Sequence, residues 1–154
     1  VGDSKSVTEE HMERLKYLKN VVKEMFRLHS IVPANGRILQ EDIPIENYLI
    51  PKGTMASFPN YTISTSERYF KNPLKFDPSR WEKEDEIHPY ATLTFGFGAR
   101  MCIGRRAAEQ EIYLTILKLV QNYKIYYEEE VPGLKVGILA TPDKPLNIYL
   151  EKRN

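Results

Sequence analysis

The chain has 154 residues, enough for one domain with a hydrophobic core. Its 22 basic and 21 acidic residues nearly cancel, so the charge predicts no binding to nucleic acid. Its single cysteine excludes an intramolecular disulfide. Because there are only three histidines besides, a closed zinc site is excluded as well. These histidines are His11, His29 and His88.

Periodic apolar residues predict one helix over residues 8–30. Leu15, Leu18 and Val22 recur at three- and four-residue steps, which places them on one face, and Pro33 ends the helix.

Short strands are predicted between residues 38 and 61. Residues 45–50 form the first strand, residues 51–53 a turn, and residues 55–58 the returning strand. Residues 61–89 hold several prolines with aromatic residues between them, which predicts a long loop anchored by its aromatic side chains. These aromatic residues are Tyr69, Phe70, Phe76 and Trp81.

A second helix is predicted over residues 105–123 from its apolar face. The remaining chain has the pattern of a hairpin, with a strand at 136–140, a turn at 142–145 and alternating apolar residues at 146–150.

The glycine-rich segment 95–104 carries the most specific chemistry. Gly96 and Gly98 allow a tight turn, and Cys102 stands just before the second helix, whose N-terminus stabilises a thiolate. Phenylalanines in the segment could shield a metal from water, and Arg100 could pair with an anionic cofactor group. A lone cysteine is more often a small buried hydrophobe, but this context favours a metal-bound thiolate.

This segment resembles the haem-binding signature of the cytochrome P-450 family, Phe-x-x-Gly-x-Arg-x-Cys-x-Gly. The matching positions are Phe95, Gly98, Arg100, Cys102 and Gly104. The resemblance implies haem b as cofactor, with the Cys102 thiolate as axial ligand of the iron. It also implies a mainly α fold with small β-sheets (α+β), of which residues 1–154 are the C-terminal haem-binding part.

Two further motifs carry the same resemblance. Glu24 and Arg27 match the family's Glu-x-x-Arg helix, and Arg80 lies in a Pro-x-Arg-Trp-like loop. Together they imply a buried hydrogen-bonded triad. Without the resemblance, Glu24 and Arg27 would be an ordinary surface ion pair.

Other family positions imply further contacts. Arg37 and His88 are expected to meet haem propionates, although an exposed strand-edge arginine and a solvent-facing histidine are the simpler interpretations. Substrate contact is expected from two apolar stretches, one of which follows Ser30 where the family often has proline. The residues concerned are Ile31, Val32, Ala34, Ile138 and Leu139.

Electron delivery is expected from a ferredoxin-type partner, because the chain resembles the mitochondrial members of the family. Lys19 and Lys23 match their docking positions, and Arg105 and Arg106 follow the cysteine as they do there. A basic patch steers an acidic partner, although solvated surface cations are the plainer interpretation. The implied location is the matrix side of the mitochondrial inner membrane. The alternatives are a flavin reductase as donor and the endoplasmic reticulum membrane.

The resemblance therefore implies a monooxygenase that inserts one atom of O₂ into a lipophilic, steroid-like substrate. No match to the family's upstream oxygen-activating helix is found, so the chain is expected to be a C-terminal fragment, inactive alone, with any membrane association made by the full-length protein. A thiolate-haem isomerase or dehydratase acting on peroxides, and a non-catalytic haem-binding fragment, remain alternatives. A thiol-redox enzyme is disfavoured, because no second cysteine can resolve an intermediate.

Overall fold

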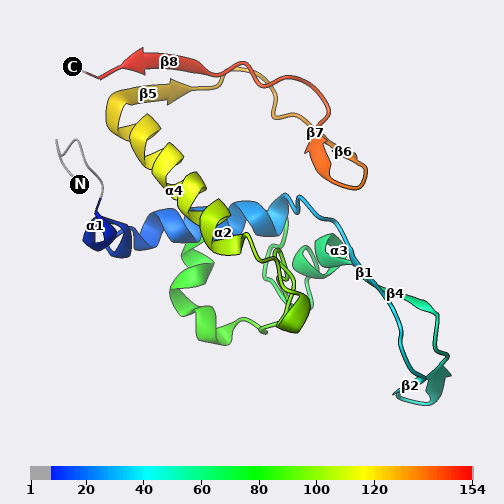
Figure 1. The fold of residues 1–154 in the computed structure, drawn as a ribbon. Coiled ribbons are helices and arrows are strands. Elements are labelled where there is room, and N and C mark those ends of the chain that lie inside the picture. Colours follow the sequence, from blue (N-terminus) through cyan, green and yellow to red (C-terminus); the bar gives the residue numbers. More distant parts are fainter. Residues whose placement is uncertain (1–7, 154) are drawn as a thin grey trace.

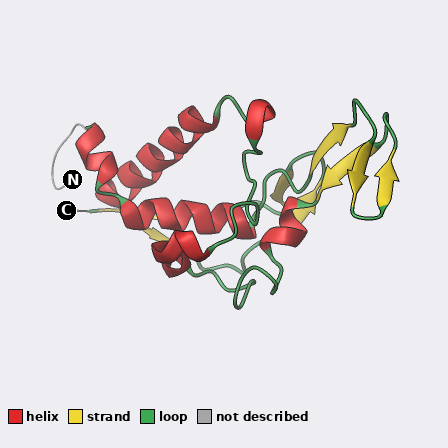
Figure 2. Ribbon diagram, turned by 90° about the horizontal axis from the view of Figure 1, so that it is seen from below, coloured by secondary structure: helices red, strands yellow, loops and turns green. Residues whose placement is uncertain are grey.

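The computed structural model describes residues 8–153, apart from the side chains of Glu9, Met12 and Glu84. Helices gather at one end, and a strand hairpin projects from the other (Figure 2). The strands described form antiparallel two-stranded sheets. This arrangement of helices with small sheets confirms the predicted α+β fold class.

The helices are α1 (Glu9–Glu13), α2 (Lys16–Leu28), α3 (Asn60–Ser64), the 3₁₀ segments η1 (Pro78–Glu86) and η2 (Gly98–Arg100), and α4 (Arg105–Asn122). The strands are β1 (Asn35–Ile38), β2 (Ile43–Ile45), β3 (Tyr48–Ile50), β4 (Met55–Phe58), β5 (Tyr123–Tyr126), β6 (Leu134–Val136), β7 (Ala140–Pro142) and β8 (Tyr149–Lys152).

Helix α2 lies at the centre and contacts α3, η1 and α4 (Figure 1). Val22 and Phe26, one turn apart, are buried on its inner face, so the predicted amphipathic periodicity is confirmed there. The prediction of one continuous helix was wrong, because the chain breaks between α1 and α2. Leu15 has φ −85° and ψ 46°, outside the helical region, and forms the N-cap of α2.

The predicted pairing of the strands was wrong in two places. Residues 55–58 pair with residues 35–38, and the hairpin of β2 and β3 is nested between them. Strand β8 pairs with β5, at the end of α4, and not with the preceding strand. Strands β6 and β7 form a small hairpin with residues 137–139 at its tip.

The hydrophobic core is small and lies between α2 and the long segment 59–94. The buried apolar residues are Val22, Phe26, Phe70, Trp81 and Ala91. Two of the four aromatic residues predicted to anchor the long segment are thus buried, whereas Tyr69 and Phe76 are exposed. Among the residues described, no helix combines the length and the apolarity needed to cross a bilayer.

Candidate functional site

Cys102 lies in a tight loop that leads from the long segment into α4. Its amide N–H donates to the Phe95 carbonyl oxygen over 2.8 Å and so closes the loop. Gly96 and Gly98 have φ values of 75° and 70°, in the left-handed region where a side chain is strained. The Cys102 thiol is free and exposed.

The loop borders a cavity of about 730 Å³. Met101, Cys102 and Ile103 form its apolar side. Arg105 and Arg106 contribute cationic groups, and Glu109, which is paired with Arg105, contributes an acidic one. A Cβ added at Gly104 would lie 3.9 Å from the Cys102 sulfur, so the glycine leaves the space beside the sulfur open. The thiol is thus accessible from a space with both apolar and basic walls.

A second cavity of about 300 Å³ joins the cysteine loop to β1. Arg37 and Phe97 both line it, together with Tyr90. The rings of Tyr90 and Phe97 meet edge to face at 5.1 Å, and His88 lies 5.8 Å from Tyr90. The structure therefore brings Arg37 next to the loop, and it places His88 beside Tyr90, whose ring packs on Phe97 of the loop.

The residues of the loop fit a haem group in their chemistry. A thiolate is a soft ligand suited to iron, and aromatic and aliphatic side chains around it suit a flat apolar macrocycle. Arg100 is exposed in η2, and within the described residues its side chain makes no hydrogen bond or ion pair, so it is available to an anionic group. The described residues hold no cluster of three or more His, Cys, Asp or Glu side chains that would suit a different metal.

Glu24 forms the centre of a buried polar cluster behind the loop. Its side chain is fully buried and accepts two hydrogen bonds from Arg27, of 2.8 and 2.9 Å. Arg80 donates to the same carboxylate over 3.0 Å. Glu24, Arg27 and Arg80 therefore come together from α2 and η1, two elements separated by about 50 residues of chain.

The cluster is larger than the motif residues alone indicate. The Trp81 indole N–H and the Asp77 amide N–H also donate to Glu24, over 3.0 and 2.9 Å. Arg27 also donates to three backbone carbonyl oxygens of the long segment, those of Ser64, Pro73 and Lys75. The structure describes no buried side-chain N or O atom without a hydrogen-bond partner.

The aromatic residue Phe70 completes this arrangement. The guanidinium groups of Arg27 and Arg80 lie over its ring at 4.9 and 5.8 Å. Sequence reasoning placed Phe70 and Trp81 only as apolar anchors, although the Trp81 indole, next to the motif arginine, is a donor that must be satisfied when buried. The cluster thus attaches the long segment to α2, and the cysteine loop continues from that segment.

We expect the cluster to make the protein sensitive to acid. Burial raises the pKa of Glu24, but hydrogen bonds from Arg27, Asp77 and Arg80 outweigh it and hold the pKa below its ordinary 4.5. A carboxyl group with a lowered folded-state pKa stabilises the fold above its unfolded pKa, and this contribution is lost as the pH falls through the folded value.

Urea unfolding between pH 7 and pH 3 therefore tests the cluster. The free energy of unfolding should stay level down to about pH 5 and decrease below it. Replacing Glu86, whose ion pair with Lys83 is exposed, by Gln should leave this profile unchanged. A free energy that rose as the pH fell below 4.5 would contradict the assigned charge state of Glu24.

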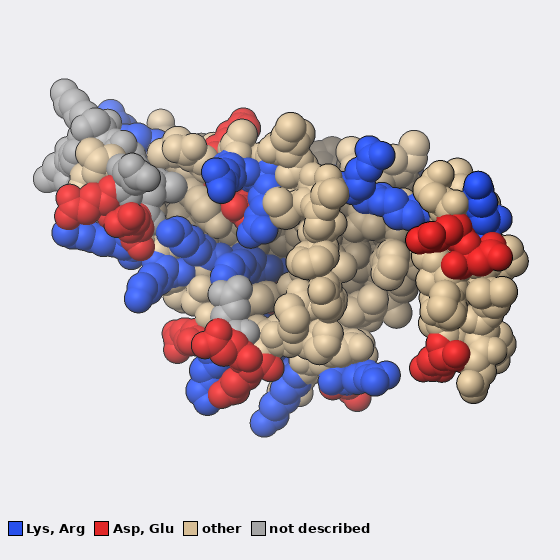
Figure 3. All heavy atoms as spheres, turned by 60° about the horizontal axis from the view of Figure 1, so that its bottom comes forward, with Lys and Arg blue, Asp and Glu red and all other residues tan. Residues whose placement is uncertain are grey.

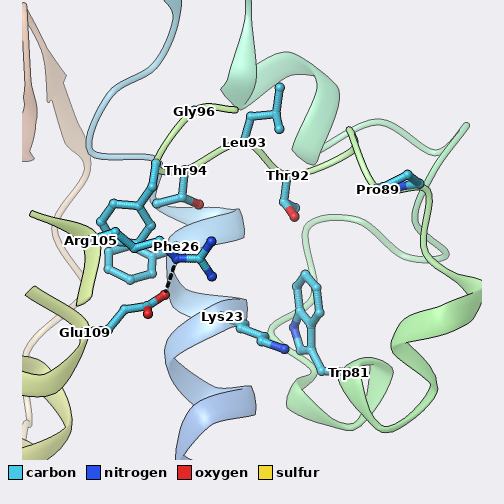
Figure 4. Close-up of a pocket in the computed structure, with 11 residues that line it drawn as sticks. Lys23, Phe26, Trp81, Pro89, Thr92, Leu93, Thr94, Gly96, Arg105 and Glu109 are labelled. Carbon is cyan, nitrogen blue, oxygen red and sulfur yellow. Dashed lines mark hydrogen bonds and ion pairs between the residues drawn. The ribbon is translucent and has the colours of Figure 1, made fainter. Parts of the chain in front are cut away.

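The predicted docking residues lie close to the cysteine loop. Lys23 and Arg105 line one cavity of about 180 Å³ between α2, the long segment and α4 (Figure 4). The Lys23 ammonium lies 5.7 Å from the centre of the Trp81 ring. Lys19 is half-buried one turn earlier on α2, and Arg106 is exposed. Figure 3 shows basic side chains gathered over the helical part of one face, with acidic groups at its margin.

The two predicted substrate-contact stretches also meet. The Ala140 amide N–H donates to the Ile31 carbonyl oxygen over 2.7 Å, which joins the β6–β7 hairpin to the segment after α2. Ile138 and Leu139 are exposed at the hairpin tip. Ser30, where the family often has proline, is buried, and its hydroxyl donates to the Val32 carbonyl oxygen. Ala34 is exposed just before β1.

Comparison with known proteins supports one family. The family profile described as Cytochrome P450 matches residues 1–149. A fruit fly (Drosophila melanogaster) protein named Probable cytochrome P450 49a1 is 39% identical over 93% of this chain and 26% of its own length. Human Sterol 26-hydroxylase, mitochondrial, is 35% identical over 88% of the chain and 27% of its own length.

A third relative is Cholesterol side-chain cleavage enzyme, mitochondrial, from Hypanus americanus, which is 39% identical over 89% of the chain and 27% of its own length. The chain thus spans about a quarter of the length of the curated relatives it matches. The family match covers nearly the whole chain and includes the cysteine loop and the Glu24 cluster. The chain therefore belongs to the cytochrome P450 family.

Proposed function

We propose that this chain forms the haem-thiolate part of a monooxygenase that inserts one oxygen atom of O₂ into a lipophilic substrate. The observation that carries the proposal is the free, exposed thiol of Cys102 in a loop closed on Phe95, beside a cavity with apolar and basic walls. Family membership implies a haem cofactor, and we propose that it is haem b.

In this proposal Cys102 ligates the iron. Gly98 allows the positive φ of the turn, and Gly104 leaves space beside the Cys102 sulfur. Phe95 and Phe97 exclude water from the iron. Arg100, Arg37 and His88 pair with the propionates, and His88 lies beside Tyr90, which lines the same cavity as Arg37. Haem bound there supplies the activation of O₂, one atom of which enters the substrate while two electrons and two protons convert the other to water.

The substrate is proposed to be sterol-like or secosteroid-like. Relatives are named as a sterol 26-hydroxylase, a cholesterol side-chain cleavage enzyme and a 25-hydroxyvitamin D-1 alpha hydroxylase. Ile31, Val32 and Ala34, with Ile138 and Leu139 at the hairpin tip, offer apolar groups for such a ligand. The meeting of Ile31 with the hairpin at Ala140 supports a joint contact surface.

The direct test is the ferrous–CO spectrum of the haem-loaded protein, followed by turnover with O₂, ferredoxin and ferredoxin reductase. A strongly red-shifted Soret band and an O₂-dependent hydroxylated product are expected. A normal thiolate spectrum with turnover of lipid peroxides, and none with O₂, would replace the monooxygenase by an isomerase or dehydratase. Absence of the thiolate band would exclude both enzymes.

Electrons are proposed to come from an acidic ferredoxin that docks on α2, in a protein located on the matrix side of the mitochondrial inner membrane. Several of the relatives are named mitochondrial, which supports this location. Lys19 and Lys23 lie four residues apart on α2, so their side chains share a helix face. Lys23 also borders the cavity next to the cysteine loop, which gives a docked donor a short path to the site.

Reversing both charges, Lys19→Glu with Lys23→Glu, is expected to weaken ferredoxin-driven turnover at low salt. Electrostatic steering changes association rates by roughly 10-fold or more at low ionic strength. Added salt should therefore reduce the difference in turnover between the double variant and the unchanged protein. The ferrous–CO spectrum should remain that of the unchanged protein.

A matched control reverses Lys52 and Lys152, which are exposed residues of the β2–β3 hairpin region and of β8. These elements lie away from α2 (Figure 1). It changes the net charge equally but leaves the docking face intact. Equal loss of turnover in both double variants would count against docking at Lys19 and Lys23.

A further inference from the structure

The first turn of α4 breaks an electrostatic preference of helices. The positive end of a helix macrodipole favours acidic residues, and a cation there costs about 0.3–1 kcal/mol. Helix α4 begins instead with Arg105 and Arg106, has no acidic residue in its first turn, and has a glycine N-cap without a side-chain hydrogen bond. Departures from such a local preference are expected at functional sites.

The two arginines differ in their surroundings. The Arg105 Nε–H donates to Glu109 over 3.0 Å, one helical turn later, and the guanidinium lies 5.7 Å from the centre of the Phe95 ring. Phe95 in turn packs edge to face on Phe26 at 5.3 Å. In the part of the chain that the structure describes, Arg106 is exposed and its side chain makes no hydrogen bond or ion pair.

The hydrogen bond to Glu109 fixes the direction of the Arg105 side chain. Figure 4 shows Glu109 on the Nε side of Arg105 and the guanidinium end directed into the cavity that Phe26, Thr94 and Lys23 border. The side chains of Arg105 and Glu109 are 46% and 25% exposed, so the pair lies partly sheltered against the protein. The Arg-before-Glu order is the less favourable one for an i,i+4 pair, so the pair is weak support for the helix alone.

We infer that Glu109 is a positioning residue that holds Arg105 against the cysteine loop and leaves Arg106 as the cation available to the electron donor. This inference rests on the proposed haem-thiolate function. It gives Arg105 and Arg106 different roles, whereas the sequence analysis predicted a docking role for both. Arg105 then acts on the thiolate side of the site, where a fixed positive charge stabilises the reduced iron centre, whereas Arg106 acts on an acidic partner.

The positioning is tested without haem or partner by residue-resolved labelling with phenylglyoxal, followed by fragmentation mass spectrometry. Arg105 should react more slowly than Arg106, by roughly two- to fivefold for a partly exposed ion pair. Glu109→Gln should remove this difference. Glu111→Gln, a matched loss of charge at an exposed site on the same helix, should preserve it.

The different roles of Arg105 and Arg106 are tested on the haem-loaded protein by measuring the iron reduction potential and the affinity for ferredoxin. Arg105→Gln should lower the iron reduction potential and change ferredoxin affinity less than twofold, and Arg105→Lys, which keeps the charge, should restore part of the potential. Arg106→Gln should weaken ferredoxin binding roughly two- to fivefold and shift the potential less than Arg105→Gln does.

Equal labelling of Arg105 and Arg106 in the unchanged protein would overturn the positioning role. Equal losses of ferredoxin affinity in Arg105→Gln and Arg106→Gln, with no change in potential in either, would overturn the division between them. The absence of a thiolate-type ferrous–CO band in the unchanged protein would overturn the proposed function instead, and the labelling result would still decide whether Glu109 positions Arg105.

Discussion

Glu24→Ala is expected to abolish haem incorporation. The substitution removes the single acceptor to which Arg27, Arg80, Trp81 and the Asp77 amide all donate. Arg27, only 1% exposed, would then be a buried charge without its counterion. Removing one partner from a buried charged network costs about 3–5 kcal/mol, a large part of the ~5–15 kcal/mol that stabilises a typical domain.

The loss should reach the cysteine loop through the long segment. Arg27 and Glu24 together hold the backbone at Pro73, Lys75 and Asp77, and the chain passes from there through η1 into the loop. Without Glu24 the long segment loses its attachments to α2 at Asp77, Arg80 and Trp81, and the packing of Phe95 on Phe26 must hold the loop without that support. Haem content per polypeptide, measured by pyridine haemochrome absorbance, and the urea unfolding curve report the two effects.

A matched control is Glu86→Ala. Glu86 pairs with Lys83 over 3.2 Å at the surface, where both side chains are at least 70% exposed. Such pairs contribute about 0–1 kcal/mol, so haem content should be unchanged. If Glu24→Ala retained haem at the level of this control, the Glu24 cluster would not be what holds the loop.

The meeting of Glu24, Arg27 and Arg80 was easier to predict than the strand pairing, because sequence motifs indicate it. Cys102, Glu24, Arg27 and Arg80 belong to motifs whose spacing is recognisable without knowledge of the tertiary contacts. Strand partners depend on contacts between distant residues. The turn residues at 51–53 predicted that residues 45–50 pair with residues 55–58. In the structure β4 pairs instead with β1, and the β2–β3 hairpin lies between them in the chain.

Two contacts were missed because each depends on a tertiary neighbour or a rotamer that the sequence does not specify. Trp81 was taken as an apolar anchor, but its indole N–H donates to Glu24, 57 positions away in the chain. Helix α4 carries two acidic residues, Glu109 and Glu111, and Glu109 is the one that accepts a hydrogen bond from Arg105, over 3.0 Å. Sequence spacing allows the i,i+4 pair but does not show which arginine rotamer forms it.

Replacing Cys102 should have the second large effect, on the spectrum and not on the fold. Cys102 is exposed at the loop, so Cys102→Ser removes the soft ligand without opening a cavity in the core. The Cys102 amide bond to Phe95 is a backbone contact and remains available to serine. We therefore expect an unfolding curve close to that of the unchanged protein, loss of the red-shifted ferrous–CO band, and loss of O₂-dependent turnover.

Cys102→His and Met101→Leu make the test specific. Histidine offers a nitrogen ligand, so haem bound to Cys102→His should show a nitrogen-ligated spectrum without turnover. Met101, exposed and adjacent, is exchanged for a side chain of similar volume, and Met101→Leu should keep the thiolate band. Because Cys102 is the only cysteine among the 154 residues, a thiolate band that persisted in Cys102→Ser would have to come from a cysteine outside them, and this loop would not be the haem ligand.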